Sequence, residues 1–270
     1  MNIYLEVGLA FIFGTVIGSF LNVVIYRLPK GEPLTGRSRC TSCNRTLEAK
    51  ELIPIISWLV LGGRCNTCNQ KISARYLLVE LLCGVLFAAW LVYLWPIGEP
   101  IQIIELVRLW FITSILITVF FIDLDYYLIL DKLVFPAISV LLVFNLTLFL
   151  LGLNADFRPT NLIYNQILAA VLSSGFFYLL WLVSKGKWIG LGDAKLMIFL
   201  GLAVGWPLII ILLLSAFYLG AIVAIPLVAL GKKHFTSHLP FATFLVPASL
   251  VCLAYGKPLL EWYLSLLGIT

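Results

Sequence analysis

Apolar residues fill most of the chain in long runs, and the polar residues gather in a few segments between them. A helix needs about 20 apolar residues to cross a bilayer, so the runs predict membrane-spanning helices. The expected spans cover residues 3–26, 77–95, 106–123, 133–152, 162–183, 194–206, 208–230 and 241–267. The pattern predicts an all-α polytopic membrane protein with about eight transmembrane helices.

Two details of this pattern refine the expected topology. The sixth run is short, and Gly205-Trp206-Pro207 is a turn signal that separates it from the seventh. The first run is too long for a signal peptide and has no basic residue before it, so we expect a retained transmembrane helix.

The long polar stretch between the first two spans carries two cysteine pairs with the same spacing, Cys40-x-x-Cys43 and Cys65-x-x-Cys68. Two such pairs complete a tetrahedral Cys₄ zinc site. A small polar segment cannot build a large core, so a metal would hold it together. We therefore expect three parts: a first transmembrane helix at 1–26, a zinc-binding domain at 27–75 and a transmembrane domain at 76–270 that holds the remaining spans. Two disulfides are the alternative for the four cysteines.

Composition and charge agree with a membrane protein and give its orientation. Hydrophobic residues make up 62% and charged residues 11% of the chain, against about a quarter charged in soluble domains. Lys and Arg concentrate in four loops, at 27–75, 123–132, 184–195 and 231–238; the exceptions are Arg108, Arg158 and Lys257. The positive-inside rule makes these loops cytoplasmic and the N-terminus external. A reducing cytoplasm favours metal over disulfides at the cysteines. Because the basic residues are spread over four loops, we expect no nucleic-acid partner.

Two aspartates lie at the ends of apolar runs, where acidic residues are costly and therefore candidates for function. Asp123 ends the third span, and Asp193 opens the sixth. An even number of crossings separates them, so both should lie near the cytoplasmic boundary at similar depth.

Two carboxylates in one site share a proton, and such a pair can activate a water and protonate a leaving amine. Helix dipoles would make Asp193 mainly the base and Asp123 mainly the acid, although a dyad titrates as a unit. The plain alternatives are an interfacial charge at Asp123 and a helix N-cap at Asp193.

Neighbouring residues add smaller expectations. Gly190 and Gly192 would let the backbone approach closely and leave room for a substrate strand. Lys195 would tune the Asp193 charge or contact substrate, with snorkelling towards lipid headgroups as the alternative. Glu80, inside the second span, has either a functional role or a salt partner such as Arg75.

The order of these motifs resembles the bacterial type IV prepilin peptidases, a family of GxGD-type intramembrane aspartic proteases. The resemblance spans nearly the whole chain. It is carried by Gly18-Ser19-Phe20-Leu21-Asn22-Val23-Val24, Arg27-Leu28-Pro29, the CxxC…CxxC segment, Arg75-Tyr76, Val79-Glu80-Leu81, Ile122-Asp123 and Gly190-Leu191-Gly192-Asp193-Ala194-Lys195.

The resemblance implies cleavage of the basic leader from type IV prepilins or pseudopilins, of pilus or type II secretion systems, at the cytoplasmic face of the bacterial inner membrane. Its catalytic pair would be Asp123 and Asp193. It also implies methylation of the new N-terminal amine from S-adenosylmethionine, which needs the cysteine-bearing domain. Membrane lipids are the other expected partner, because the basic 27–75 loop would meet either anionic lipid headgroups or the carboxylate of the cofactor.

The chain departs from the family pattern at two places, and other functions stay open. Leu130-Asp131 stands where the family usually has Pro-Asp, and Pro240-Phe241 is followed by Ala242-Thr243 rather than Gly-Pro. A peptidase without methylation is one alternative. A proton-coupled transporter that uses the two aspartates as relays is another, and a zinc-bearing scaffold without chemistry is a third.

Overall fold

The structure is a computed structural model of the 270-residue chain, and it describes residues 3–151, 162–229, 241–266 and 268. The expected cytoplasmic loop 231–238, Pro240 and Arg158 lie outside the described residues. The chain forms two compact units, residues 1–118 and 119–270, and each is treated by itself. The expected boundary at residue 76 therefore falls inside the first unit.

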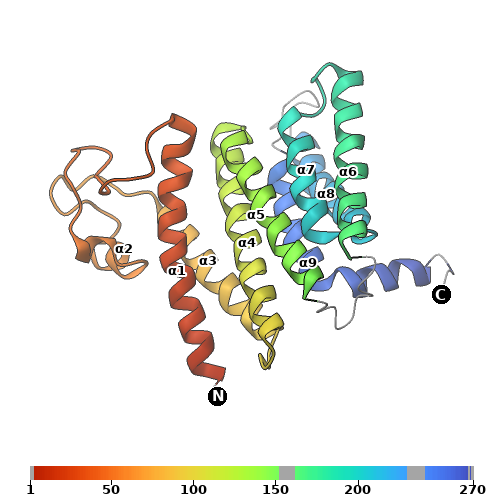
Figure 1. Cartoon of the computed structure of the whole chain (residues 1–270). Coiled ribbons are helices and arrows are strands. Elements are labelled where there is room, and N and C mark those ends of the chain that lie inside the picture. The colour runs from red at the N-terminus through yellow and green to blue at the C-terminus, as the bar shows by residue number, and fades with distance from the viewer. Residues whose placement is uncertain (1–2, 152–161, 230–240, 267, 269–270) are drawn as a thin grey trace. The chain divides into compact units, whose positions relative to one another are not determined.

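Helices dominate both units (Figure 1). The helices of the first unit are α1 (Ile3–Arg27), α2 (Ile56–Val60), α3 (Ala74–Tyr93) and the start of α4 (Pro100–Tyr126), with 3-10 helices at Leu28–Lys30 and Ala49–Leu52. The second unit holds the end of α4 and then α5 (Asp131–Leu150), α6 (Leu162–Ser184), α7 (Leu191–Val204), α8 (Leu208–Ala229) and α9 (Ala242–Leu266). In the described residues the extended pairing is limited to two isolated β-bridges, both near the cysteines.

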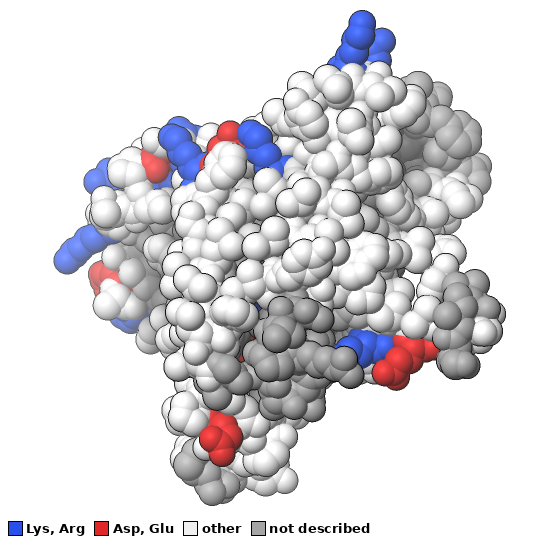
Figure 2. All heavy atoms as spheres, turned by 45° about the vertical axis from the view of Figure 1, so that its right-hand side comes forward, with Lys and Arg blue, Asp and Glu red and all other residues white. Residues whose placement is uncertain are grey.

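Seven helices among the described residues are long and apolar enough to cross a membrane. They are α1, α3, α4, α5, α6, α8 and α9. The face of the molecule in Figure 2 is mostly uncharged, with Lys, Arg, Asp and Glu confined to small groups. The all-α polytopic architecture expected from the sequence is confirmed, as is the cysteine-bearing insert between the first two spans.

The sixth expected span is the short helix α7. Its 14 residues rise about 21 Å, less than the roughly 30 Å hydrocarbon core of a bilayer. Gly205 ends it with φ 78, and Pro207 follows, so α7 and α8 are separate helices as the turn signal predicted. α7 packs against α5, α6, α8 and α9, and most of its side chains are buried. A helix that is apolar all round is typical of such a central position.

Small residues let helices approach closely in both units. A Cβ on Gly14 of α1 would lie 2.8 Å from the Cα of Gly84 in α3. A Cβ on Gly201 of α7 would lie 2.4 Å from the Cα of Ala170 in α6. Small residues at such contacts are typical of helix packing in membranes, where lipid removes the hydrophobic drive for association.

Polar side chains also join the helices. The Asn22 amide of α1 donates to the carbonyl of Tyr76 in α3 at 3.0 Å. In the second unit, the Asn145 amide of α5 donates to the Leu202 carbonyl of α7 at 3.0 Å. These bonds connect each pair of helices at a defined register.

Gly14→Leu should destabilise the first unit by about 1–3 kcal/mol, because the new side chain meets the α3 backbone. The measurement is thermal unfolding in detergent. Gly8→Leu on the same helix is the matched control, since a Cβ at Gly8 has no atom within 4 Å. Equal melting temperatures for the two variants would contradict the proposed α1–α3 packing.

Candidate functional site

The second unit brings together the two aspartates singled out by the sequence. Asp123 lies on the last turn of α4 and is 5% exposed, and Asp193 lies in the first turn of α7 and is 9% exposed. Their carboxyl groups are close enough to interact electrostatically. Whether these residues catalyse a reaction stays a prediction at this point, but their proximity is a property of the fold.

The Asp123 carboxylate accepts hydrogen bonds from the start of α9. The backbone N–H groups of Thr243 and Ala242 donate to it. Its Oδ2 atom is buried and has no hydrogen-bond partner within the described part of the chain. One oxygen is therefore fixed by the helix terminus, while the other is free to meet a water or a substrate.

Asp193 is held by the start of its own helix. Gly190 is the N-cap of α7, and its backbone N–H donates to the Asp193 carboxylate three residues later. The Asp193 N–H in turn donates to the Gly190 carbonyl at 3.2 Å. Only the N3 half of a capping box is present, because glycine has no side chain to complete it, and Asp193 is not the N-cap itself.

The two glycines of the GxGD motif differ in their surroundings. A Cβ on Gly192 would lie 2.8 Å from the Cβ of Ile129, in the loop between α4 and α5. A Cβ on Gly190 would lie 3.4 Å from Asp193 Oδ2, an ordinary contact distance. The space beside Gly192 is therefore occupied by this chain's own loop, and the predicted substrate contact of the glycines remains untested.

Lys195 has a partner that the sequence did not indicate. Its ammonium group contacts both carboxylate oxygens of Asp131, at 2.7 Å and 2.8 Å, and lies 5.7 Å from the ring of Phe135. Asp131 is the first residue of α5, so the ion pair connects the starts of α5 and α7. The missing proline before Asp131 does not prevent this contact.

In the first unit, the four cysteines of the polar segment form one cluster. The sulfur atoms of Cys40, Cys43, Cys65 and Cys68 all lie within 4.8 Å of one another. The sulfurs of Cys40 and Cys68 are 3.8 Å apart. Four sulfurs bound at about 2.3 Å to one tetrahedral ion are also about 3.8 Å apart, so the cluster fits a metal ion. None of these four cysteines forms a disulfide in the structure.

Each cysteine pair belongs to a turn of the same construction. Residues 39–44 and 64–69 share the pattern Arg-Cys-x-x-Cys-Asn, a repeat that the sequence analysis missed. Asn44 and Asn69 have φ 56 and φ 54, and each donates its N–H to the carbonyl of the first cysteine at 3.0 Å. Asparagine tolerates this left-handed conformation better than most residues, so the Asn after each pair was the available signal.

Backbone amides inside these turns point at the first sulfur of each pair. The N–H groups of Cys68 and Thr67 lower the pKa of the Cys65 thiol to about 6. The N–H groups of Cys43 and Ser42 likewise lower the pKa of Cys40. Because a metal binds the thiolate form, these amides favour metal binding at the first cysteine of each pair.

Arg45 breaks the symmetry of the two turns, since Gln70 occupies the matching place in the second. Its guanidinium lies 2.6 Å from Glu51 Oε1 and also contacts the sulfur of Cys65. The Glu51 carboxylate is the larger cause that raises the pKa of Arg45, and the Cys65 side chain is a smaller one. Arg45 in turn lowers the pKa of Glu51. Arg45 is thus a fixed positive charge beside the cysteine cluster.

Comparison with known proteins places both units in one family. Residues 12–94 match the bacterial peptidase A24 N-terminal domain, and residues 110–225 match the type IV leader peptidase family. A relative in Aeromonas hydrophila, named prepilin leader peptidase/N-methyltransferase, is 32% identical over 97% of this chain and 95% of its own length. The chain belongs to the type IV prepilin leader peptidase family.

Further family members have the same name and similar coverage. The one in Legionella pneumophila is 32% identical over 97% of this chain and 94% of its own length. The one in Stutzerimonas stutzeri is 30% identical over 95% and 93%. No solved structure matches the chain. The two family matches fall largely on the two compact units, with the aspartates in the second match and the cysteines in the first.

Replacing Arg45 by Gln should weaken metal binding about 10-fold, because groups that contact metal ligands typically affect affinity by about that factor or more. Competition with a chromophoric chelator measures the change. Arg64→Gln is the matched control, since it removes the same charge next to Cys65 from an exposed side chain. If both variants lost affinity equally, only the net charge would matter, and the specific role of Arg45 would be wrong.

Proposed function

We propose that this chain cuts the leader from type IV prepilins by aspartic-protease chemistry and then methylates the new N-terminal amine with S-adenosylmethionine. Family membership supports both activities, because its relatives are named leader peptidase and N-methyltransferase. The observation that carries the protease proposal is the pair Asp123 and Asp193, two buried carboxyl groups that interact electrostatically.

Peptide cleavage at this pair follows from the way two close carboxyl groups share a proton. The ionised member takes a proton from a water, whose oxygen attacks the scissile carbonyl carbon. The protonated member then gives its proton to the leaving nitrogen as the peptide bond breaks. The free Oδ2 of Asp123 offers an acceptor for that water.

The hydrogen bonds favour the opposite assignment of acid and base to the one expected from the helix dipoles. The sequence placed Asp123 at a helix C-terminus, which disfavours its charge, but it could not show that the start of α9 donates two N–H groups to this carboxylate. Asp193 accepts from one backbone N–H. Donors to a carboxylate favour its ionised form. We therefore assign Asp123 as the base and Asp193 as the acid in the free enzyme.

The substrate class agrees with the position of the two aspartates at helix ends. A prepilin presents a basic leader in the cytoplasm and an apolar helix in the bilayer, so the cut must occur where lipid meets water. We place this face on the cytoplasmic side of the bacterial inner membrane, with the N-terminus outside, because of the positive-inside rule. Gly190, Gly192 and Lys195 remain the proposed substrate contacts around Asp193.

The metal is proposed to be zinc, bound structurally by Cys40, Cys43, Cys65 and Cys68. Four thiolates in a tetrahedral arrangement are the donor set of structural zinc sites. All four ligands come from the protein and leave no open position, so the ion would stabilise the 27–75 domain rather than take part in catalysis.

Asp123→Asn and Asp193→Asn should each lower the rate of leader cleavage by at least about 10³-fold, because each variant leaves only one carboxyl group to act as acid and base. Mass spectrometry of a purified prepilin substrate before and after incubation measures leader loss. Glu261→Gln, which removes an exposed carboxylate of α9, is the control and should cleave normally. Normal cleavage by either Asp variant would refute the dyad.

The purified chain should contain one zinc ion per molecule, measured by plasma mass spectrometry. Cys43→Ser should lose it, because three thiolates no longer complete the site. Cys252→Ser makes the same change at a buried thiol of α9 that donates to the Leu208 carbonyl, and it should keep the zinc. A metal-free wild-type chain with oxidised cysteines would instead support the disulfides.

A further inference from the structure

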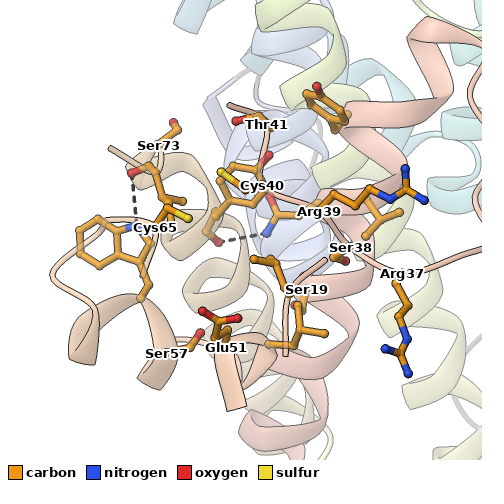
Figure 3. A pocket seen from close by; sticks show the side chains of 18 of the residues that line it. Ser19, Arg37, Ser38, Arg39, Cys40, Thr41, Glu51, Ser57, Cys65 and Ser73 are labelled. Atoms are coloured by element: carbon orange, nitrogen blue, oxygen red, sulfur yellow. Dashed lines mark hydrogen bonds between the residues drawn. The ribbon is translucent and has the colours of Figure 1, made fainter. Parts of the chain in front are cut away.

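The first unit contains a large cavity beside the cysteine cluster. It has a volume of about 780 Å³, within the roughly 300–1,000 Å³ usual for small-molecule sites. Helices α1 and α3 and the polar segment between them line it. Figure 3 shows side chains from these parts around it, with Ser19 from α1 and with Cys40 and Cys65 from the metal site. The cysteine cluster thus helps to form the wall of this cavity.

Glu80 lines the same cavity and is the unusual residue in it. It sits about 9 Å along α3 from the start of that helix and is only 8% exposed. The Ile55 N–H donates to its Oε2 at 2.7 Å, and the Ser19 hydroxyl donates to the same carboxyl group. No Lys or Arg forms an ion pair with it in the described ranges. An ionisable residue held in a membrane helix by neutral groups is a candidate for function.

The contact between Ile55 and Glu80 requires a strained backbone. Ile55 has φ 63 and ψ −55, and the Ile56 N–H donates to the Pro54 carbonyl at 2.6 Å, which makes a γ-turn centred on Ile55. This conformation is a genuine outlier for a β-branched residue and costs about 1–3 kcal/mol. Such strain concentrates at functional sites, where the surrounding structure holds it in place.

We propose that this cavity is the methyl-transfer site: it binds S-adenosylmethionine and the new N-terminal amine, and Glu80 binds the amine and removes its proton. This inference rests on the proposed methyltransferase activity and adds the location and the base. The arginine, serine and asparagine side chains that line the cavity offer donors for a polar cofactor, and its volume leaves room for the end of a peptide beside it.

The chemistry explains why a carboxylate is needed there. A new N-terminus has a pKa of about 7.7–8.0 and is mostly an ammonium ion at neutral pH, without a free electron pair. Glu80 takes one proton from it. The nitrogen then forms a bond to the methyl carbon, the carbon–sulfur bond of the donor breaks, and its sulfonium becomes a neutral thioether. Glu80 later releases the proton to water.

The test separates binding, cleavage and methylation in the full-length purified chain. Cleavage is measured on a prepilin, and methyl addition is measured on a pilin peptide that already lacks its leader, both by mass spectrometry. Calorimetry with S-adenosylhomocysteine measures binding of the cofactor product. Glu80→Gln keeps an oxygen that can accept from Ile55, so the fold and the strained turn should persist.

For Glu80→Gln we expect cleavage and S-adenosylhomocysteine affinity within about 3-fold of wild type. Methylation should fall by at least about 10²-fold, the usual contribution of a general base. The remaining rate should rise about tenfold per pH unit up to the pKa of the amine, because hydroxide and solvent then remove its proton. Ser19→Ala, a smaller change, should slow methylation less and leave cleavage unchanged. Wild-type methylation by Glu80→Gln would overturn the role of Glu80.

A second variant tests the cavity without touching Glu80. Ser57→Trp places a large ring in the cavity and should abolish S-adenosylhomocysteine binding while cleavage continues. Lys50→Trp, at an exposed position of the same segment outside the lining, is the matched control and should bind normally. Normal binding by Ser57→Trp would overturn the location. If the wild-type chain cleaved the prepilin but neither bound S-adenosylhomocysteine nor methylated the leaderless peptide, the methyltransferase activity itself would be overturned.

Discussion

Keeping a carboxylate inside a membrane protein requires groups that replace its water, because an unpaired charge in an apolar environment is very costly. This chain meets that requirement with backbone N–H groups. Asp123 receives them from the start of α9, Asp193 from the start of α7, and Glu80 from a strained turn at Ile55. A backbone donor adds no charge of its own, so each carboxyl group keeps the ability to exchange a proton.

Both units hold a buried carboxyl group among packed helices, next to a different candidate site in each unit. In the second, the short buried helix α7 carries Asp193 to the end of α4, and close contacts such as Gly201 against Ala170 make this position possible. In the first, α1 and α3 are joined by glycine contacts and by Asn22, and the cysteine turns close the cavity next to them. Disruption of the cysteine cluster should therefore affect the shape of the cavity more than the aspartate pair.

Local patterns were sufficient for the secondary-structure elements and for the cysteine cluster. Long apolar runs gave the spanning helices, and Gly205-Trp206-Pro207 gave the break between α7 and α8. The two CxxC pairs gave the cluster, because each pair acts within a few residues. The same local patterns did not show what surrounds the candidate residues: Ile129 fills the space beside Gly192, and Asp131 pairs with Lys195.

The sequence by itself determined the helical membrane class, the cysteine cluster and the two aspartates. Apolar runs, cysteine spacing and acidic residues at the ends of apolar runs can all be recognised from the order of residues alone. Only the tertiary structure decided that the N-terminal amides of α9 reach Asp123, that Arg45 contacts Cys65, and that Glu80 bonds to Ile55. The first and last of these contacts join segments far apart in sequence. Their formation depends on how helices pack, which no local pattern encodes.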